Sequence, residues 1–172
     1  MKPGRSLLLA LLRLLAISAC LGSGMAVADE YSEVGQMLRA GRLTEAQTRV
    51  DRALAAKPRD PQMRYFKGVI QRESGQSAEA LATFTKLTED YPELPEPYNS
   101  LAVIHAAQGE FDKARVALEM AIRANPGYAT AHENLGDIHA RLAQQAYCKA
   151  LQLDATNSSV RSRLAALGAS CP

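Results

Sequence analysis

The feature that most constrains the fold of this chain is a pattern of small residues and prolines that returns every 34 residues. The positions that share this spacing are Gly41, Gly75 and Gly109; Ala46, Ala80 and Ala114; Val50, Phe84 and Leu118; and Pro58, Pro92 and Pro126. A fixed period of this length is typical of proteins built from stacked copies of one supersecondary unit, which share a continuous core. The sequence therefore predicts a repeat scaffold.

The residue types favour helices over strands. The chain has no Trp and only three Phe, and segments such as RVALEMAIRA at 115–124 consist largely of strong helix formers. A 34-residue period with a central glycine, small residues at fixed offsets and a closing proline resembles the tetratricopeptide repeat, a helix–turn–helix unit. The resemblance covers essentially residues 29–167 and implies an all-α fold, a right-handed α-solenoid of helix hairpins.

The first repeat, about 27–60, is the weakest of the regular ones. Its first helix carries a short apolar stripe, and Glu33 stands where the family usually has Leu. Thr44 is the candidate N-cap of the second helix. The stripe consists of Tyr31, Val34, Met37 and Leu38.

The second and third repeats, 61–94 and 95–128, are regular. Asp60 is placed to accept backbone N–H groups at the start of a helix, and Pro61 is tolerated in the first turn, where its missing N–H has no partner to lose. Gly68 and Ala80 are the small residues at which the helices of the second repeat are expected to approach closely. The third repeat is the best match to the family.

The fourth repeat, a degenerate one at 129–155, has lost its turn. The small residues of its second half arrive five positions earlier than the period predicts, and no Gly or Pro lies between Asp137 and Asp154. An unbroken three-and-four spacing of apolar residues continues through the segment, so both halves are expected to merge into one helix of roughly Ala129–Leu153. A C-terminal capping helix at 157–168 follows, with Asn157 or Ser158 as its N-cap.

Residues 1–28 are typical of a signal peptide. They have a basic start, an apolar run interrupted by Arg13, and an A-x-A site at Ala26–Ala28 that predicts cleavage before Asp29. One alternative is that the segment Ile17–Cys20 resembles a bacterial lipobox, in which Cys20 would be lipidated and would anchor the protein to a membrane. A second is an uncleaved anchor, although the apolar run falls short of the ~20 residues that a span needs. We expect export to a Gram-negative periplasm.

The charge distribution argues against nucleic acid as a partner. The formal net charge is +2, but Lys2, Arg5 and Arg13 lie in the first segment and every acidic residue lies at or after Asp29. The remainder of the chain is therefore close to neutral, whereas sequence-independent binding of nucleic acid usually needs a clustered excess of cations.

The histidines and cysteines suggest structure more than chemistry. His105 and His139 are 34 residues apart, at the position where the family usually has Tyr packed between two helices. A metal site of His132, Asp137 and His139 can be drawn, but it lacks the tight spacing of known motifs, and we expect no catalytic residues, cofactor or metal. A Cys148–Cys171 disulfide is left open, because Cys171 would overshoot Cys148 by roughly 12 Å unless the tail folds back.

The resemblance also implies a binding surface, since the first helices of successive repeats line a concave groove in this family. The residues at these groove positions are mostly polar, with one aromatic side chain. The alternative to a binding role is that each of them lies on a solvated face without specific function. Asn134 lies at a position where family members often use Asn to bond a peptide backbone. The groove positions are Gln62, Tyr65, Val69, Arg72, Glu96, Asn99, Val103, Glu133, Asn134, Asp137 and Arg141.

Two functions follow as hypotheses. The first is a non-catalytic periplasmic scaffold or adaptor that binds a protein or peptide in this groove, in envelope assembly or secretion. The second is a membrane-tethered lipoprotein, lipidated at Cys20, that acts as an assembly factor for pili or outer-membrane proteins. The sequence identifies neither the partner nor the oligomeric state.

Overall fold

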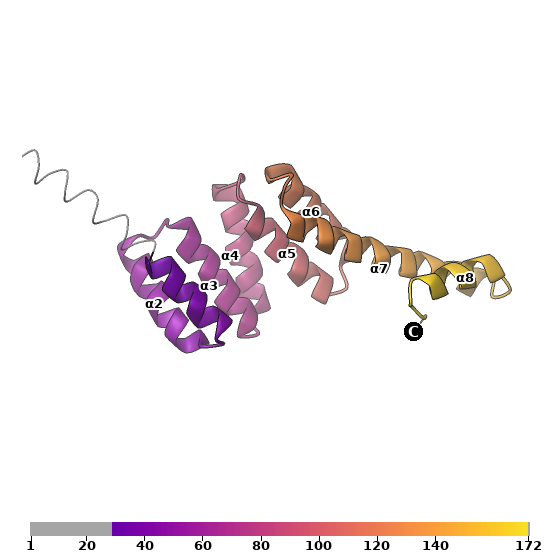
Figure 1. Ribbon diagram of the computed structural model, residues 1–172, viewed down its shortest axis with the longest axis horizontal. Coiled ribbons are helices and arrows are strands. Elements are labelled where there is room, and N and C mark those ends of the chain that lie inside the picture. The colour runs from indigo at the N-terminus through magenta and orange to yellow at the C-terminus, as the bar shows by residue number, and fades with distance from the viewer. Residues whose placement is uncertain (1–28, 172) are drawn as a thin grey trace, which may run out of the picture. The chain divides into compact units, whose positions relative to one another are not determined.

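A computed structural model describes residues 29–171, and within this range the chain is helical with no strands, which confirms the all-α prediction (Figure 1). Contacts divide the chain into two compact units, Met1–Ile70 and Gln71–Pro172, with the boundary inside one helix. The single domain 29–172 and its repeat bounds stay a prediction. The helices are residues 29–39, α2 (Leu43–Ala56), α3 (Pro61–Glu73), α4 (Ser77–Asp90), α5 (Pro95–Ala107), α6 (Phe111–Ala124), α7 (Ala129–Leu153) and α8 (Ser158–Ala166).

The predictions for the N-terminal segment fall on residues outside the described range. This applies to the signal peptide 1–28, its A-x-A cleavage site and the lipidation of Cys20. Within 29–171, no helix is both long enough and apolar enough to cross a membrane.

The first unit has its core where the helix at 29–39, α2 and α3 meet. The buried side chains are apolar, and the predicted stripe of the first helix faces this core, with Val34 fully buried and Tyr31, Met37 and Leu38 partly buried. A helix with a one-sided apolar stripe is stabilised mainly by burying that stripe against its neighbours. The buried residues of this cluster are Val34, Ala46, Val50, Met63 and Ile70.

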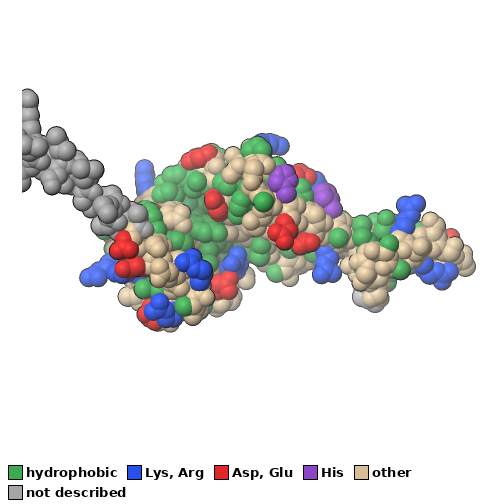
Figure 2. Space-filling model, viewed as in Figure 1, with side chains coloured by type: hydrophobic (Ala, Val, Ile, Leu, Met, Phe, Trp, Pro, Cys, Tyr) green, Lys and Arg blue, Asp and Glu red, His purple; other side chains and the backbone are tan. Residues whose placement is uncertain are grey.

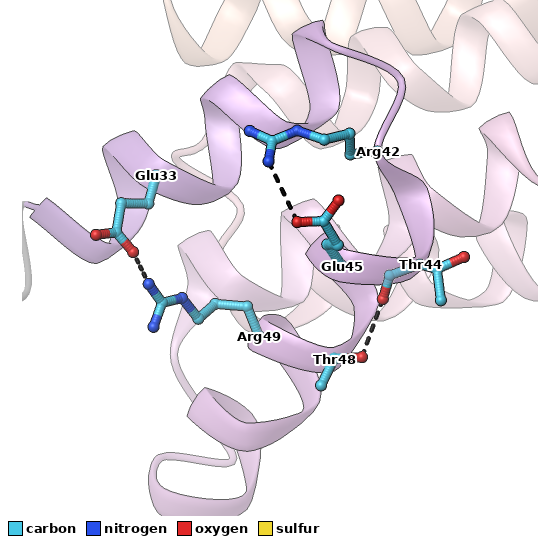
Figure 3. A network of polar contacts seen from close by, with 6 residues as sticks. All are labelled: Glu33, Arg42, Thr44, Glu45, Thr48 and Arg49. Carbon is cyan, nitrogen blue, oxygen red and sulfur yellow. Dashed lines mark hydrogen bonds and ion pairs between the residues drawn. The ribbon is translucent and has the colours of Figure 1, made fainter.

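Glu33 has a partner that explains its place in the apolar position. Its carboxylate forms an ion pair with the guanidinium of Arg49 on α2, so the side chain links the first two helices (Figure 3). Both side chains are partly exposed, and pairs of this kind contribute about 0–1 kcal/mol. Arg49 Nε is buried without a hydrogen-bond partner. The opening repeat therefore replaces an apolar contact by a polar link of modest strength.

The prediction that Thr44 caps α2 is wrong. The helix begins at Leu43 after Arg42, which makes no side-chain cap, and Thr44 already lies in the first turn. Its carbonyl accepts a hydrogen bond from the Thr48 hydroxyl at 3.0 Å (Figure 3). The cap position is Arg42, and its guanidinium has only donors, so it cannot accept a backbone N–H of the first turn.

The repeated glycines close their helices by one shared geometry. At Gly109, φ is +75°, its N–H donates to the Ala106 carbonyl, and the N–H of Glu110 donates to the His105 carbonyl at 2.9 Å. This is the Schellman ending, which needs a left-handed residue that glycine adopts without strain. Gly41 and Gly75 have the same sign of φ and the same pair of bonds, so the 34-residue spacing of glycine is a spacing of helix ends.

Asp60 caps α3 as predicted and also reaches a second helix. Its Oδ1 accepts the N–H of Met63 at 2.9 Å, and its Oδ2 accepts the hydroxyl of Tyr31 at 2.6 Å. This hydrogen bond to a carboxylate is the main cause that raises the pKa of Tyr31 to about 12, with burial adding to it. One aspartate therefore holds both the start of α3 and the first helix.

The second unit is organised around α5, which contacts α4, α6 and α7 (Figure 1). Small residues bring the helices together, since Ala102 of α5 and Ala114 of α6 are both buried in the same cluster. α5 begins with prolines in its first turn, where the missing N–H costs nothing. The buried residues of this core are Tyr98, Ala102, Ala114, Leu118, Ala121, Ala131 and Ile138.

The predicted merger of the fourth repeat is confirmed, because α7 runs as one helix of 25 residues from Ala129 to Leu153. Its first half packs against α5 and α6, whereas α8 lies beside its second half (Figure 1). α8 is capped by Asn157, whose Oδ1 accepts the N–H of Val160 at 3.1 Å, as expected. Leu153, at the end of α7, is 79% exposed.

The C-terminal tail folds back on α7 and forms the disulfide that the sequence left open. Gly168 has φ +63° and ends α8, after which the Ser170 carbonyl accepts a hydrogen bond from Gln144 Nε2 at 2.7 Å. This bend removes the overshoot expected for a straight tail. Cys171 then lies 5.5 Å from Cys148 between Cα atoms and is bonded to it.

Candidate peptide-binding surface

The predicted groove residues are all accessible, since none of them is buried. Gln62, Tyr65 and Val69 belong to the first unit, where the Tyr65 ring lies 6.3 Å from that of Phe66. Arg72, at the end of α3, pairs with Glu73. The remaining positions, all on α5 and α7, belong to the second unit and are described together below.

Asn99 and Asn134 are brought together although they are 35 residues apart. The Nδ2 group of Asn134 donates to Oδ1 of Asn99 at 2.7 Å, so the two amides join α5 to α7. The expectation of an Asn134 available to a peptide backbone is thus refined, because one of its two N–H donors is already used. A side-chain amide also has an acceptor oxygen, so the pair as a whole still offers both donors and acceptors.

Asn134, one member of the amide pair, lines a small hollow between α5 and α7. Its volume is about 160 Å³, and its floor is mainly apolar, with Asn134 and Asp137 as the polar side chains. Val103, which is 38% exposed, contributes the largest accessible apolar side chain of the α5 wall. The lining residues are Ala102, Val103, Ala106, Leu118, Asn134, Asp137 and Ile138.

A second, larger hollow of about 560 Å³ lies between α7 and the C-terminal tail. Asp137 lines both hollows, so they adjoin along α7. The α7 side consists of Asp137, Ala140, Arg141 and Gln144, and the tail side of Leu167, Gly168, Ala169 and Ser170. Asp137 and Arg141 were predicted from the sequence, whereas the tail residues were not. The signal that could have placed them is the pair Cys148 and Cys171, whose bond requires the tail to fold back on α7.

The surface carries no large patch of one charge on the face that Figure 2 shows, where basic and acidic side chains are interspersed over the described residues. In the groove set of the second unit, Glu96, Glu133 and Asp137 are set against two cations, of which Arg72 is paired with Glu73. This arrangement is unlike the cationic surface that binds nucleic acid phosphates.

His105 has the structural role that its repeat position implies. Its side chain is 17% exposed, and Nδ1 lies 2.7 Å from Oε2 of Glu110, just after the Gly109 turn. Lys113 donates to the other carboxylate oxygen of Glu110 at 2.9 Å. These two bonds, with Lys113 the larger cause, hold the pKa of the Glu110 carboxyl below its usual range.

The matching prediction for His139 is wrong, since this side chain is exposed rather than packed between two helices. The cause is the missing turn: α7 continues straight, so no second helix folds back over this face. Gly136 shows the same effect, because it is exposed and a Cβ there would meet no atom within 4 Å outside its own helical turn. The equivalent residue one repeat earlier, Ala102, is buried.

The metal site drawn from the sequence is not assembled. Nε2 of His132 lies 2.9 Å from the carbonyl oxygen of Pro126. Within residues 29–171, no group of three or more His, Cys, Asp or Glu side chains is placed to hold a metal ion.

Comparison with known proteins identifies the repeat. The chain is 36% identical over 83 residues to the chloroplastic tetratricopeptide repeat domain-containing protein PYG7 of Arabidopsis thaliana, which covers 45% of this chain and 28% of that protein. It is 31% identical over 91 residues to the probable biofilm formation methyltransferase WspC of Pseudomonas putida, covering 53% of this chain and 22% of that one. The chain thus spans less than a third of these curated relatives.

Solved structures agree on the fold. A thermophilic tetratricopeptide repeat protein of Thermus thermophilus superposes with a TM-score of 0.58 at 22% identity, over 81% of this chain and 97% of that one. Two models of the tetratricopeptide repeat match residues 38–95 and 71–135. Together with the glycine-closed hairpins described above, these matches show that the chain belongs to the tetratricopeptide repeat family.

Proposed function

We propose that the chain is a non-catalytic scaffold that binds an extended segment of a protein on the α5–α7 surface. The observation that carries the proposal is the joining of Asn99 and Asn134 at the edge of an accessible apolar hollow. Peptides are recognised by amides that bond the backbone and by apolar recesses that take alternate side chains. Repeats of this family generally mediate interactions between proteins, which supports the same class of ligand.

We propose further that the protein works in the periplasm, in envelope assembly or secretion. The support is the basic start, apolar run and A-x-A site of residues 1–28. Mass measurement of the N-terminus in purified envelope fractions tests the location. A chain beginning at Asp29 fits a released periplasmic scaffold, whereas a lipidated Cys20 would establish the tethered alternative. A chain that retains Met1 in the cytosol would contradict both.

The scaffold is proposed without enzymatic activity. One relative is named a methyltransferase, but the match covers only 22% of that protein. The name describes the whole relative and not the matched part. In the described part of this chain, the accessible hollows hold Asp137, Arg141 and Asn134 without an adjoining histidine or thiol to act with them. Binding is therefore the function that this surface supports best.

Site-specific photo-crosslinking in cells tests the binding surface. A photoreactive amino acid replaces Val103 on α5, and in a matched control it replaces Val116 on α6, which is 50% exposed on the side of α6 away from Ala114 and Leu118. We expect a discrete crosslinked partner from position 103 and none from position 116. Equal crosslinking from both positions would contradict a defined surface between α5 and α7.

A direct binding measurement complements the crosslink. A peptide selected on the purified protein from a library of random linear peptides serves as the probe. The Val103→Glu substitution places a charge in the hollow and should weaken binding at least about tenfold, whereas Val116→Glu should not. Asn99→Ala together with Asn134→Ala should also weaken it. Binding that survives all of these changes would remove the α5–α7 surface from consideration.

A further inference from the structure

The larger of the two hollows exists only because the C-terminal tail lies against α7. Its far wall consists of Leu167, Gly168, Ala169 and Ser170, which follow α8 and have no helix of their own. Asp137 belongs to this hollow and to the smaller one between α5 and α7. A segment bound at the paired asparagines would therefore meet the tail if it continued along α7.

Noncovalent contacts of α8 and the tail contribute to holding this wall. Leu164 is the buried residue of α8, and Leu167 is 41% exposed. The tail adds a hydrogen bond from Gln144 Nε2 to the Ser170 carbonyl at 2.7 Å. A helix of nine residues is well below the length at which isolated helices are stable in water, so α8 depends on its attachments to α7.

The covalent attachment is the Cys148–Cys171 disulfide, which ties the end of the tail to the middle of the second half of α7. Cys148 is buried, whereas Cys171 is exposed. Access is one of the factors that decide which sulfur a thiolate attacks, and Cys171 is the residue of the pair that solvent reaches. The bond that fixes the wall is thus open to thiol chemistry from one side.

We propose that this disulfide is a redox clamp that builds the C-terminal wall of the peptide-binding surface. Oxidised, it holds residues 167–170 in place, so that a bound segment contacts both hollows; reduced, it releases them and weakens binding. The inference rests on the proposed function and adds to it a second contact region and its regulation.

The reaction requires a dithiol as reductant. One thiolate of the dithiol attacks Sγ of Cys171, forming a mixed disulfide and releasing Cys148 as a thiolate, which takes up a proton. The second thiol of the reductant loses its proton and attacks the sulfur of the mixed disulfide that belongs to the reductant. Cys171 is released as a thiolate and takes up a proton. Two electrons and two protons reach the protein, and the dithiol becomes a disulfide.

The structural half of the proposal is tested without any ligand. Hydrogen exchange is measured for the amides of α8 and for α5 as an internal reference, in the oxidised chain, after reduction with dithiothreitol, and in Cys171→Ser. We expect exchange in α8 to rise at least about tenfold in the last two states, while α5 stays unchanged. Unchanged exchange in α8 would show that the disulfide does not hold the tail and would overturn the proposal.

The binding half uses the library-selected linear peptide as probe. Its affinity should fall by about tenfold in the reduced chain and in Cys171→Ser, and a chain cut short after Ala166 should bind equally weakly whether oxidised or reduced. Equal affinity in the oxidised and reduced full chain, with loss in Val103→Glu, would overturn the clamp and leave the proposed function intact. Binding that is indifferent to Val103→Glu would instead reject the proposed function. A library that yields no binder counts against the proposed function, and hydrogen exchange then decides whether the disulfide holds the tail.

Discussion

The third and fourth repeats begin alike and end differently. In the third, α5 stops at the Gly109 turn and α6 folds back over it, so Ala102 is buried. In the fourth, the helix continues past the equivalent point, and Gly136, at the position that corresponds to Ala102, is exposed. The difference shows that packing demands a small residue at this repeat position only where a second helix folds back over it.

The largest effect is expected for the leucine core of the regular repeat. Leu118 of α6 is fully buried, so Leu118→Ala should lower the free energy of unfolding by about 2–5 kcal/mol. Leu153→Ala, at the exposed end of α7, should change it by less than about 0.5 kcal/mol. Urea unfolding followed by circular dichroism measures both, and equal losses would mean that the end of α7 is covered after all.

The second comparison places a larger side chain at Ala102 and at Gly136, which occupy equivalent positions in their repeats. Ala102→Leu should cost about 1–3 kcal/mol, because the side chain would overpack the contact between α5 and its neighbours. Gly136→Leu should cost nothing, since a Cβ there points into open space. The same unfolding assay applies, and a loss of more than about 1 kcal/mol at Gly136 would contradict its exposure.

The third comparison replaces a glycine by alanine at two places, a turn and the interior of a helix. Gly109→Ala places a Cβ at φ +75° and should lower the free energy of unfolding by about 1–2 kcal/mol. Gly136→Ala lies inside a helix and should raise it by about 0.5–1 kcal/mol. If the two variants shift stability in the same direction, the helix does not pass unbroken through residue 136.

The sequence predicted the parts of this fold that rest on periodicity and local chemistry. The span of α7 followed from an apolar stripe without Gly or Pro, and the cap at Asp60 from its place before Pro61. The prediction for Thr44 was wrong because α2 begins one residue earlier, after Arg42, which places Thr44 inside the first turn. The prediction for His139 was wrong because α7 continues past it and no second helix folds back over its side chain.

The contacts that sequence could not supply are those between residues far apart in the chain. The pairing of Glu33 with Arg49 and of Asn99 with Asn134 depends on how neighbouring helices are set against one another, which no local pattern encodes. The fold-back of the tail combines the left-handed Gly168, the hydrogen bond at Ser170 and the Cys148–Cys171 disulfide. The groove positions stay a prediction, and the hollow that the tail completes was not predicted.

The smallest predicted effect concerns pH and the carboxylate of Glu110, which follows the Gly109 turn of the regular repeat. The pKa of Glu110 is held low in the folded state, so its contribution to stability is present above the ordinary carboxyl range and is lost as the pH falls through the folded pKa. Urea midpoints of wild type and Glu110→Gln should therefore differ near neutral pH and converge in acid. A gap between the two proteins that stays constant from neutral to acid pH would reject the role of the Glu110 carboxylate.

The unbroken course of α7 is the claim on which the comparison depends, and one distance tests it. Spin labels are placed at His132→Cys and Leu153→Cys, both exposed, in an oxidised chain that carries Cys20→Ser and in which Cys148 and Cys171 are bonded to each other. One continuous helix separates the two Cα atoms by about 32 Å, at 1.5 Å per residue. A pulsed electron resonance distance near that value supports the merged repeat. A distance of about 15 Å or less, as in an antiparallel hairpin with helices 8–10 Å apart, would contradict it.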